Sequence, residues 1–243
     1  MPPDPSYLLA SLQIKTPLIG VYDAPDPGAF SPLIDAGDAQ RTCIFSFYDA
    51  WRDGTSLVLT RERHGCRGCG TWFFGEEHRS REEFIRFLAD DEGLKASQDL
   101  MARWLDVHRP YTPEHDYLLI GPLKANQENY LKTVTIFANP DQLSALLLGA
   151  QYNHVPGEPP PAIAPFGSGC MELLPLFDDL DANQAVIGAT DIAMRQHLPP
   201  DLLALTMTRS MFAQLCALDE RSFLSKPFWR RLMAAREAAG SES

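Results

Sequence analysis

Residues 133–151, Thr-Val-Thr-Ile-Phe-Ala-Asn-Pro-Asp-Gln-Leu-Ser-Ala-Leu-Leu-Leu-Gly-Ala-Gln, place a strand pattern directly before a helix pattern. The first five residues are all β-branched or aromatic, which favours a strand. Asn139 then predicts a helix N-cap, and Pro140 suits the first helical turn because its missing N–H would have no partner there. The stretch therefore predicts a strand followed at once by a helix that ends near Gln151.

Similar short patterns recur on both sides of this unit. Further strands are predicted at 17–23, 56–60, 117–120, 184–188 and 202–207, and helices at 43–51, 80–108 with a break at Gly93, 210–218 and 227–235. The Pro-rich and Gly-rich stretches 24–38 and 155–161 are predicted to be loops. Strands interspersed with helices predict an α/β or α+β fold, in which a mixed sheet is flanked by helices. We expect one domain over residues 15–236, an N-terminal extension over 1–14 and a flexible tail over 237–243.

The composition narrows the class of protein. Hydrophobic residues make up 45% of the chain and charged residues 22%, which is ordinary for a globular protein. The formal net charge of −11 repels phosphate backbones and anionic lipids, so we expect neither nucleic acid nor a membrane as a partner. The sequence has no leader pattern and no run of roughly 18 apolar residues, so we expect a soluble, cytoplasmic protein.

The segment His64-Gly65-Cys66-Arg67-Gly68-Cys69-Gly70 places two thiols and three glycines within seven residues. A Cys-x-x-Cys pair brings two sulfurs within reach of one metal ion or of each other. The glycines, Gly68 in particular, let the backbone curl and direct N–H groups at sulfur. Because five cysteines are an odd number in a chain of this length, a secreted disulfide framework is not expected. The segment therefore predicts a site for metal binding or thiol redox chemistry.

A four-coordinate metal site would need two donors besides Cys66 and Cys69. The candidates are Cys43, Cys170, His64 and His78, and Cys170 is the better distant cysteine because Gly167-Ser-Gly169 before it allows close backbone approach. Cys216 lies on an apolar helical stripe and is predicted to be a core residue.

Three chemistries fit this set of residues. Structural zinc would use four sulfur and histidine ligands, an iron–sulfur cluster would favour Cys43, Cys66, Cys69 and Cys170, and a dithiol–disulfide couple would need only Cys66 and Cys69. Arg67 and His64 would lower the pKa of a neighbouring thiol, which suits the redox alternative.

Asp191 and Arg195 lie four residues apart after the strand predicted to end at Gly188. Such side chains could face a ligand at the carboxyl end of a sheet strand. The ordinary alternative is an exposed helical ion pair that contributes a few tenths of a kcal/mol. No dinucleotide fingerprint and no phosphate-binding lysine loop accompany them in the sequence.

The chain resembles the bacterial and archaeal family catalogued as domain of unknown function 169. The resemblance covers roughly residues 15–220 and rests on Pro17-Leu-Ile-Gly-Val, Cys43, His64-Gly-Cys-Arg-Gly68, Asn139-Pro-Asp-Gln-Leu, Gly149-Ala-Gln-Tyr152, Gly169-Cys170 and Ile187-Gly-Ala-Thr-Asp-Ile-Ala-Met-Arg195. It implies that Cys43, Cys66 and Cys170 form the shared set, whereas the position of Cys69 usually holds a small residue. The family brings no established activity.

We therefore expect a metal-binding or iron–sulfur-binding protein with a redox role, and with Cys43, Cys66 and Cys170 as core ligands. Cys69 or His64 would be the fourth donor, and the cofactor would be an iron–sulfur cluster or zinc. The alternatives are a metal-free module that binds a small molecule, with Gly68, Gly169, Asp191 and Arg195 near the ligand, and a dithiol–disulfide exchange protein with a redox partner.

Overall fold

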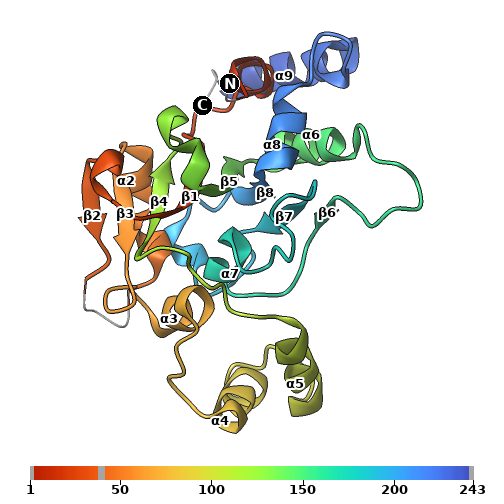
Figure 1. Cartoon of the computed structure of the whole chain (residues 1–243). Helices are drawn as coiled ribbons and strands as arrows, with labels where there is room; N and C mark the ends of the chain where they lie inside the picture. The colour runs from red at the N-terminus through yellow and green to blue at the C-terminus, as the bar shows by residue number, and fades with distance from the viewer. Residues whose placement is uncertain (1–2, 38–41, 241–243) are drawn as a thin grey trace.

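The computed structural model describes residues 3–37 and 42–240, whose strands form one open eight-stranded sheet in the order β2-β3-β4-β1-β5-β8-β7-β6 (Figure 1). The central strand β1 (Ile19–Ala24) pairs antiparallel with both β4 (Tyr117–Pro122) and β5 (Leu131–Ala138). Only the two outermost pairs of the sheet are parallel. The predicted mixed sheet in an α/β arrangement is thus confirmed.

The strands at the two edges of the sheet were not predicted. They are β2 (Leu33–Asp35) and β6 (Ala162–Ile163), and each lies in or beside a Pro-rich stretch expected to be a loop. The prediction of a loop at 33–35 was therefore wrong. Strands this short cannot show the alternating pattern by which a strand is recognised in a sequence. The other three strands, all predicted, are β3 (Ser56–Leu59), β7 (Ala185–Gly188) and β8 (Leu203–Thr208).

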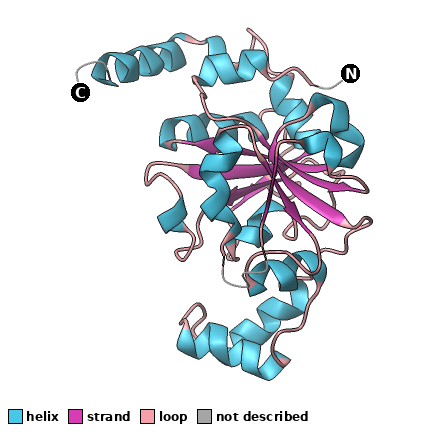
Figure 2. Ribbon diagram, turned by 90° about the vertical axis from the view of Figure 1, so that its left-hand side faces the viewer, coloured by secondary structure: helices cyan, strands magenta, loops and turns pink. Residues whose placement is uncertain are grey.

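Helices cover both faces of the sheet (Figure 2). The α-helices are α1 (Ser6–Leu12), α2 (Tyr48–Arg52), α3 (Arg67–Phe74), α4 (Arg81–Arg86), α5 (Gln98–Val107), α6 (Pro140–Gln151), α7 (Gly169–Leu173), α8 (Arg209–Cys216) and α9 (Pro227–Gly240). Short 3-10 turns are η1 (Gly28–Phe30), η2 (Ile44–Phe47), η4 (Ala125–Tyr130), η5 (Arg195–His197) and η6 (Phe223–Ser225), and η3 (Phe87–Asp91) is a π-helical turn.

The capping patterns place the helix starts as the sequence predicts. Asn139 accepts a hydrogen bond from the N–H of Gln142, whose side chain accepts one from the Asn139 N–H in return. Ser80 and Glu83 form the same reciprocal pair at the start of α4. Each pair satisfies N–H groups that would otherwise lack partners at a helix start.

Side chains alternate between two cores because successive residues of a strand point to opposite faces of the sheet. On β1, Tyr22 is buried in the core under α1, α6, α8 and α9, which we call the upper core. Val21 is buried in the core beside α2, α3 and α7, which we call the lower core. All four candidate cysteine ligands lie in the lower core or pack against it.

The two ends of the chain are more ordered than the sequence indicates. Residues 1–14, expected to be an extension, contain α1, whose Leu8 and Leu12 are buried in the upper core. The tail expected over 237–243 begins within α9, and residues 1–2 and 241–243 lie outside the described residues. None of the helices described is both long and apolar enough to cross a bilayer.

Candidate functional site

The Cys-x-x-Cys segment does not lie in a loop but forms the start of α3. The loop after β3 ends at Gly65, whose φ of +80° favours glycine and whose Cβ would lie 2.7 Å from the Thr42 carbonyl oxygen. Cys66 is then the N-cap of α3, with extended φ and ψ, and Cys69 lies in the first turn. Because N–H groups at a helix start lack helical partners, those of Gly68 and Cys69 are free to bond the Cys66 sulfur.

Three chain segments bring four thiols toward one another at this helix start. The Sγ atoms of Cys66 and Cys69 lie 3.6 Å apart, and the Cys69 thiol also contacts that of Cys170 at the start of α7. A Cβ on Gly68 would be 3.6 Å from Cys66 Sγ and 3.9 Å from Cys170 Sγ, so this glycine faces both sulfurs. Cys43, the N-cap of η2, is close enough to Cys66 and Cys170 for a negative charge on either sulfur to disfavour ionisation of the Cys43 thiol. All of these cysteines are free thiols.

The surroundings of Cys43, Cys66 and Cys69 shift the pKa values of these three thiols in different directions. A hydrogen bond from Cys69, together with the N–H groups of Cys69 and Gly68, lowers the pKa of Cys66 to about 6 despite its burial. The contacts of Cys69 with the thiols of Cys170 and Cys66, and its burial, raise the pKa of Cys69 well above that of a free thiol. Burial raises the pKa of Cys43 to about 11. Cys66 is therefore the thiol poised to ionise at neutral pH.

Gly169 and Asp191 lie close to the thiols, whereas Arg195 does not face them. The Gly169 N–H donates to Asp191 Oδ2 at 3.1 Å, and a Cβ on Gly169 would overlap Met194 Sδ, so glycine is needed for close packing. The Arg195 guanidinium donates to backbone carbonyl oxygens of residues 199, 200 and 202 at 2.6–3.1 Å. Arg195 begins the short turn η5, so the spacing of four residues does not place it against Asp191 on one helix.

The imidazole of His64 contacts Glu76, which lies beyond the end of α3. Its Nε2 lies 3.0 Å from Glu76 Oε2, and His78 Nε2 lies 3.1 Å from the same oxygen. Its Nδ1 lies 3.1 Å from the Cys66 carbonyl oxygen. His64, Glu76 and His78, which we call the histidine cluster, present three donor atoms within 4.8 Å of one another.

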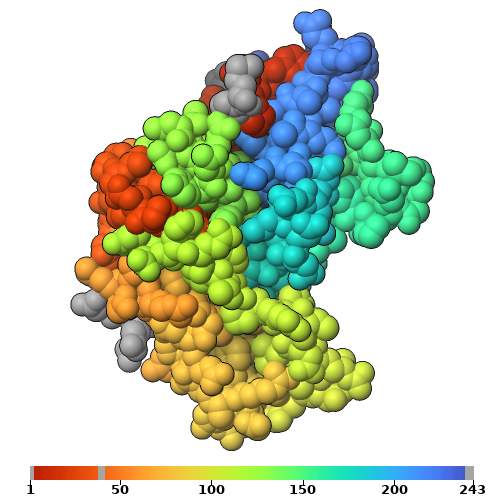
Figure 3. Space-filling view, viewed as in Figure 1, coloured from red at the N-terminus to blue at the C-terminus, as the bar shows by residue number. Residues whose placement is uncertain are grey.

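A cavity of about 810 Å³ opens beside both groups. Cys66 and Gly68 from the thiol group and Glu76 and His78 from the histidine cluster line it, with the aromatic walls of Trp72, Phe84 and Phe87. The segment from α3 to α5, coloured orange to yellow-green, forms the lower end of the molecule in Figure 3. The Cys66 thiol and the His78 imidazole thus line the same cavity.

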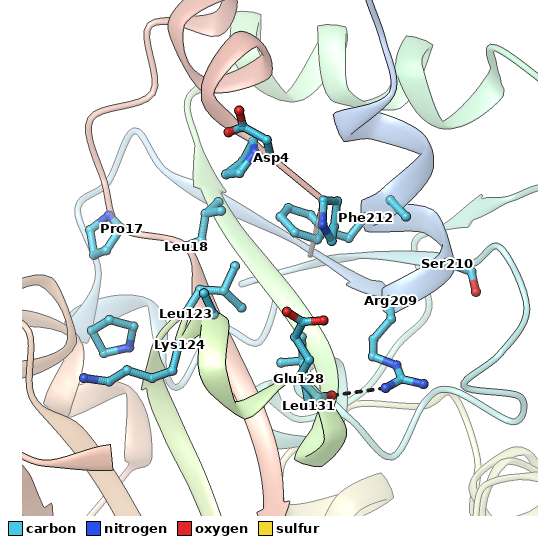
Figure 4. Close-up of a pocket in the computed structure, with 15 residues that line it drawn as sticks. Asp4, Pro17, Leu18, Leu123, Lys124, Glu128, Leu131, Arg209, Ser210 and Phe212 are labelled. Carbon is cyan, nitrogen blue, oxygen red and sulfur yellow. Dashed lines mark hydrogen bonds between the residues drawn. The ribbon is translucent and has the colours of Figure 1, made fainter. Parts of the chain in front are cut away.

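A second cavity, of about 790 Å³, lies against the upper core. Figure 4 shows Leu18, Leu123 and Phe212 in its lining, with Lys124 and Arg209 on the same side as Glu128. Arg209 donates to the Glu128 carbonyl oxygen at 3.1 Å. This cavity is mainly apolar, and it lies against the upper core, whereas the thiols belong to the lower core.

Asp23, Glu114 and His115 form a second group with metal-ligand chemistry, which we call the aspartate cluster. The fully buried Asp23 carboxylate accepts hydrogen bonds from Tyr111 Oη at 2.7 Å and from the N–H groups of Glu114 and His115 at 2.8 and 3.0 Å. His115 Nδ1 lies 3.1 Å from the same carboxylate. These bonds fasten the segment before β4 to the end of β1.

The sequence indicated the thiols but not Glu76. His78 was a candidate ligand for the thiol site, yet it faces Glu76 instead. The available signal is Gly75, whose φ of +69° ends α3 and turns the chain back. A glycine at the end of this short helix predicts that the chain reverses direction after it, which is what brings Glu76 back beside α3.

Comparison with protein families gives a match that covers most of the chain. The family described as uncharacterised ArCR, domain of unknown function 169, matches residues 8–217. The chain belongs to this family. The match includes the lower core, all the thiols and the histidine cluster, and it confirms the resemblance predicted from the sequence. No curated protein and no solved structure matches the chain.

Proposed function

We propose that this member of the family binds a cysteine-ligated metal centre, with Cys43, Cys66, Cys69 and Cys170 as ligands. The observation that carries the proposal is the convergence of thiols from η2, α3 and α7 at one glycine-lined corner of the lower core. Buried cysteines that only fill space do not need N–H groups aimed at sulfur, as at Cys66. Thiolate ligands do benefit from such N–H groups.

The spacing of the sulfurs bears on the kind of centre. Two sulfurs bound to one tetrahedral zinc lie about 3.8 Å apart, since each Zn–S bond is about 2.3 Å, and the 3.6 Å between Cys66 and Cys69 is close to this value. Among the described residues, however, no three sulfurs lie within 4.8 Å of one another. An iron–sulfur cluster accommodates wider spacing because its cysteines bind different irons, so the whole set favours a cluster.

The test is anaerobic purification followed by measurement of metal and acid-labile sulfide per chain and of the visible spectrum. Iron with sulfide, lost in Cys66→Ser and Cys170→Ser but kept in Cys216→Ser, is the expected result. Zinc with the same variant pattern would keep the cysteine site and change the metal. Intact thiols with no metal in the wild-type protein would overturn the proposal. Such a centre is suited to a redox role in the reducing cytoplasm.

Dithiol–disulfide exchange is the second candidate, favoured by the contact between Cys66 and Cys69 at a cavity wall. The Cys66 thiolate would attack a partner's disulfide and release one partner thiol. The Cys69 thiol would then lose its proton and attack the Cys66 sulfur, and the displaced partner thiolate would take up a proton and leave a Cys66–Cys69 disulfide behind. Cys170→Ser separates the candidates, because exchange would survive this substitution whereas the metal centre would not.

The third candidate, binding of a small molecule without metal, is favoured by the two cavities of about 810 and 790 Å³. A metabolite that binds the folded protein raises its melting temperature. A panel of metabolites that raises the melting temperature, together with no effect of a chelator, would favour this candidate over the first.

A further inference from the structure

We propose that His64, Glu76 and His78 form a separate binding site for one divalent first-row transition metal ion. Its ligand atoms would be His64 Nε2, Glu76 Oε2 and His78 Nε2. The site does not use the thiols, so it stands or falls independently of the proposed cysteine centre.

The local fold brings the three ligands together around Gly70. Beyond α3, the Glu76 N–H donates to the Gly70 carbonyl oxygen at 3.0 Å, and Thr71 Oγ1 donates to the Glu76 carbonyl oxygen at 3.0 Å. These bonds place Glu76 beside the helix. A Cβ on Gly70 would lie 2.7 Å from both His64 Cε1 and His78 Nε2 and 2.8 Å from Glu76 Oε2. Glycine at this position therefore leaves the room that the cluster occupies.

The distances match those between neighbouring ligands of a metal ion. Two ligand atoms at right angles, each about 2.1 Å from the ion, are about 3.0 Å apart. Each histidine nitrogen lies 3.0 or 3.1 Å from Glu76 Oε2. Two imidazoles and one carboxylate on one side of an ion make up the facial triad that binds divalent metals such as iron.

The arrangement of protons also favours a cation. The Cys66 carbonyl accepts from His64 Nδ1, so a neutral His64 carries its proton there and its Nε2 directs a lone pair toward Glu76. His78 Nε2 is buried and makes no hydrogen bond, although Glu76 Oε2 is only 3.1 Å away. A short distance without hydrogen-bond direction is expected when both atoms point to a third position rather than at each other.

The ion would be reachable and would keep open coordination positions. His64 is only 6% exposed, whereas the side chains of Glu76 and His78 are 27% and 21% exposed and line the 810 Å³ cavity. Three protein ligands on one side leave the cavity side for water or an exogenous ligand, as in metal sites that act on small molecules.

The test uses Co²⁺ as the probe, added to metal-free protein that carries Cys66→Ser and Cys170→Ser. One equivalent should bind with d–d absorption and no thiolate charge-transfer band. Adding Glu76→Gln or His78→Ala should weaken binding about a hundredfold, while His108→Ala should not. His108 lines the same cavity, but its Nδ1 faces the Trp104 carbonyl oxygen, so it is the matched control.

Absence of binding, or binding unchanged by Glu76→Gln and His78→Ala, would overturn the proposal. Glu76→Gln is close in shape to the original residue, and its circular dichroism spectrum shows whether the fold persists. The same substitution in the protein with intact thiols should leave a thiolate-to-cobalt band in place. If cobalt-loaded wild-type protein showed no thiolate-to-cobalt band at all, this result would count against the cysteine centre and not against the histidine cluster.

Discussion

The histidine cluster and the aspartate cluster contain the same kinds of residue, yet their hydrogen bonds differ. In the aspartate cluster, O–H and N–H groups point at the Asp23 carboxylate, and the Glu114 side chain is paired with Lys132 at 3.1 Å. In the histidine cluster, one Glu76 oxygen faces two imidazole nitrogens, and His78 Nε2 has no hydrogen bond. Composition and proximity thus do not separate a structural cluster from a candidate metal site, whereas the balance of donors and acceptors does.

Removing the acceptor of the aspartate cluster should have the largest effect. Asp23→Ala leaves the Tyr111 hydroxyl and the N–H groups of Glu114 and His115 without their partner, which should lower the free energy of unfolding by about 3–5 kcal/mol. Urea unfolding of this variant and of Asp99→Ala, whose side chain is 70% exposed, measures the difference. A loss below about 1 kcal/mol for Asp23→Ala would contradict a structural role for the cluster.

Cys66 and Cys216 offer a similar comparison between two thiols, one with hydrogen-bond donors at its sulfur and one that is only buried. Hydrogen bonds lower the pKa of Cys66 to about 6, whereas burial raises the pKa of Cys216 to about 12. In metal-free protein at pH 7, Cys66 should react with iodoacetamide at least about a hundredfold faster, even after allowing for its weaker intrinsic nucleophilicity. Site-resolved mass spectrometry should show the Cys66 rate rising with pH to half its maximum near pH 6, and a midpoint near 9 would refute the assignment.

Two glycines of one helix provide a narrower test of the histidine cluster. Gly70→Ala places a methyl group 2.7–2.8 Å from an atom of each cluster member, so it should abolish Co²⁺ binding there and cost about 1–3 kcal/mol of stability. Gly68→Ala makes only ordinary contacts of 3.6 and 3.9 Å and should leave this Co²⁺ site intact. Equal Co²⁺ affinities in the two variants would show that metal binding at the histidine cluster does not require the absence of a side chain at Gly70.

The smallest effect is expected at the exposed member of the aspartate cluster. Glu114 is 67% exposed, and its ion pair with Lys132 is screened by water, so Glu114→Gln should change stability by less than about 1 kcal/mol. Thermal unfolding at low and high salt is sufficient to measure it. A large loss would mean that the Glu114 carboxylate, and not only its N–H, holds the cluster together.

Much of the fold follows from local sequence, because its strands and helix starts carry their own signals. The strand at 133–137 and the helix opened by Asn139-Pro140 appear as predicted, as do the helix that starts at residue 80 and its break at Gly93. The order of the strands does not follow, since β1 pairs with β4 and β5 from about a hundred residues away. Such long-range pairing depends on how both faces of the sheet are covered, which no single segment encodes.

The candidate site divides in the same way. The Cys-x-x-Cys spacing predicts the contact between Cys66 and Cys69 because one helical turn separates them. The approach of Cys170 depends on packing of α7 against α3, and the partnership of His64 with Glu76 depends on the reversal at Gly75. Arg195 was grouped with Asp191 because the two lie four residues apart after the strand that ends at Gly188. This spacing implies contact only in a helix, and the chain there forms turns.

The edges of the sheet have a consequence for how molecules of this protein meet one another. The outermost strands, β2 and β6, span only three and two residues. A long, regular edge would offer unpaired N–H and C=O groups on which a neighbouring molecule could add a strand, a common start of aggregation. Edges this short give an incoming strand few backbone groups to pair with, so a wide, open sheet can persist at high concentration without growing from one molecule into the next.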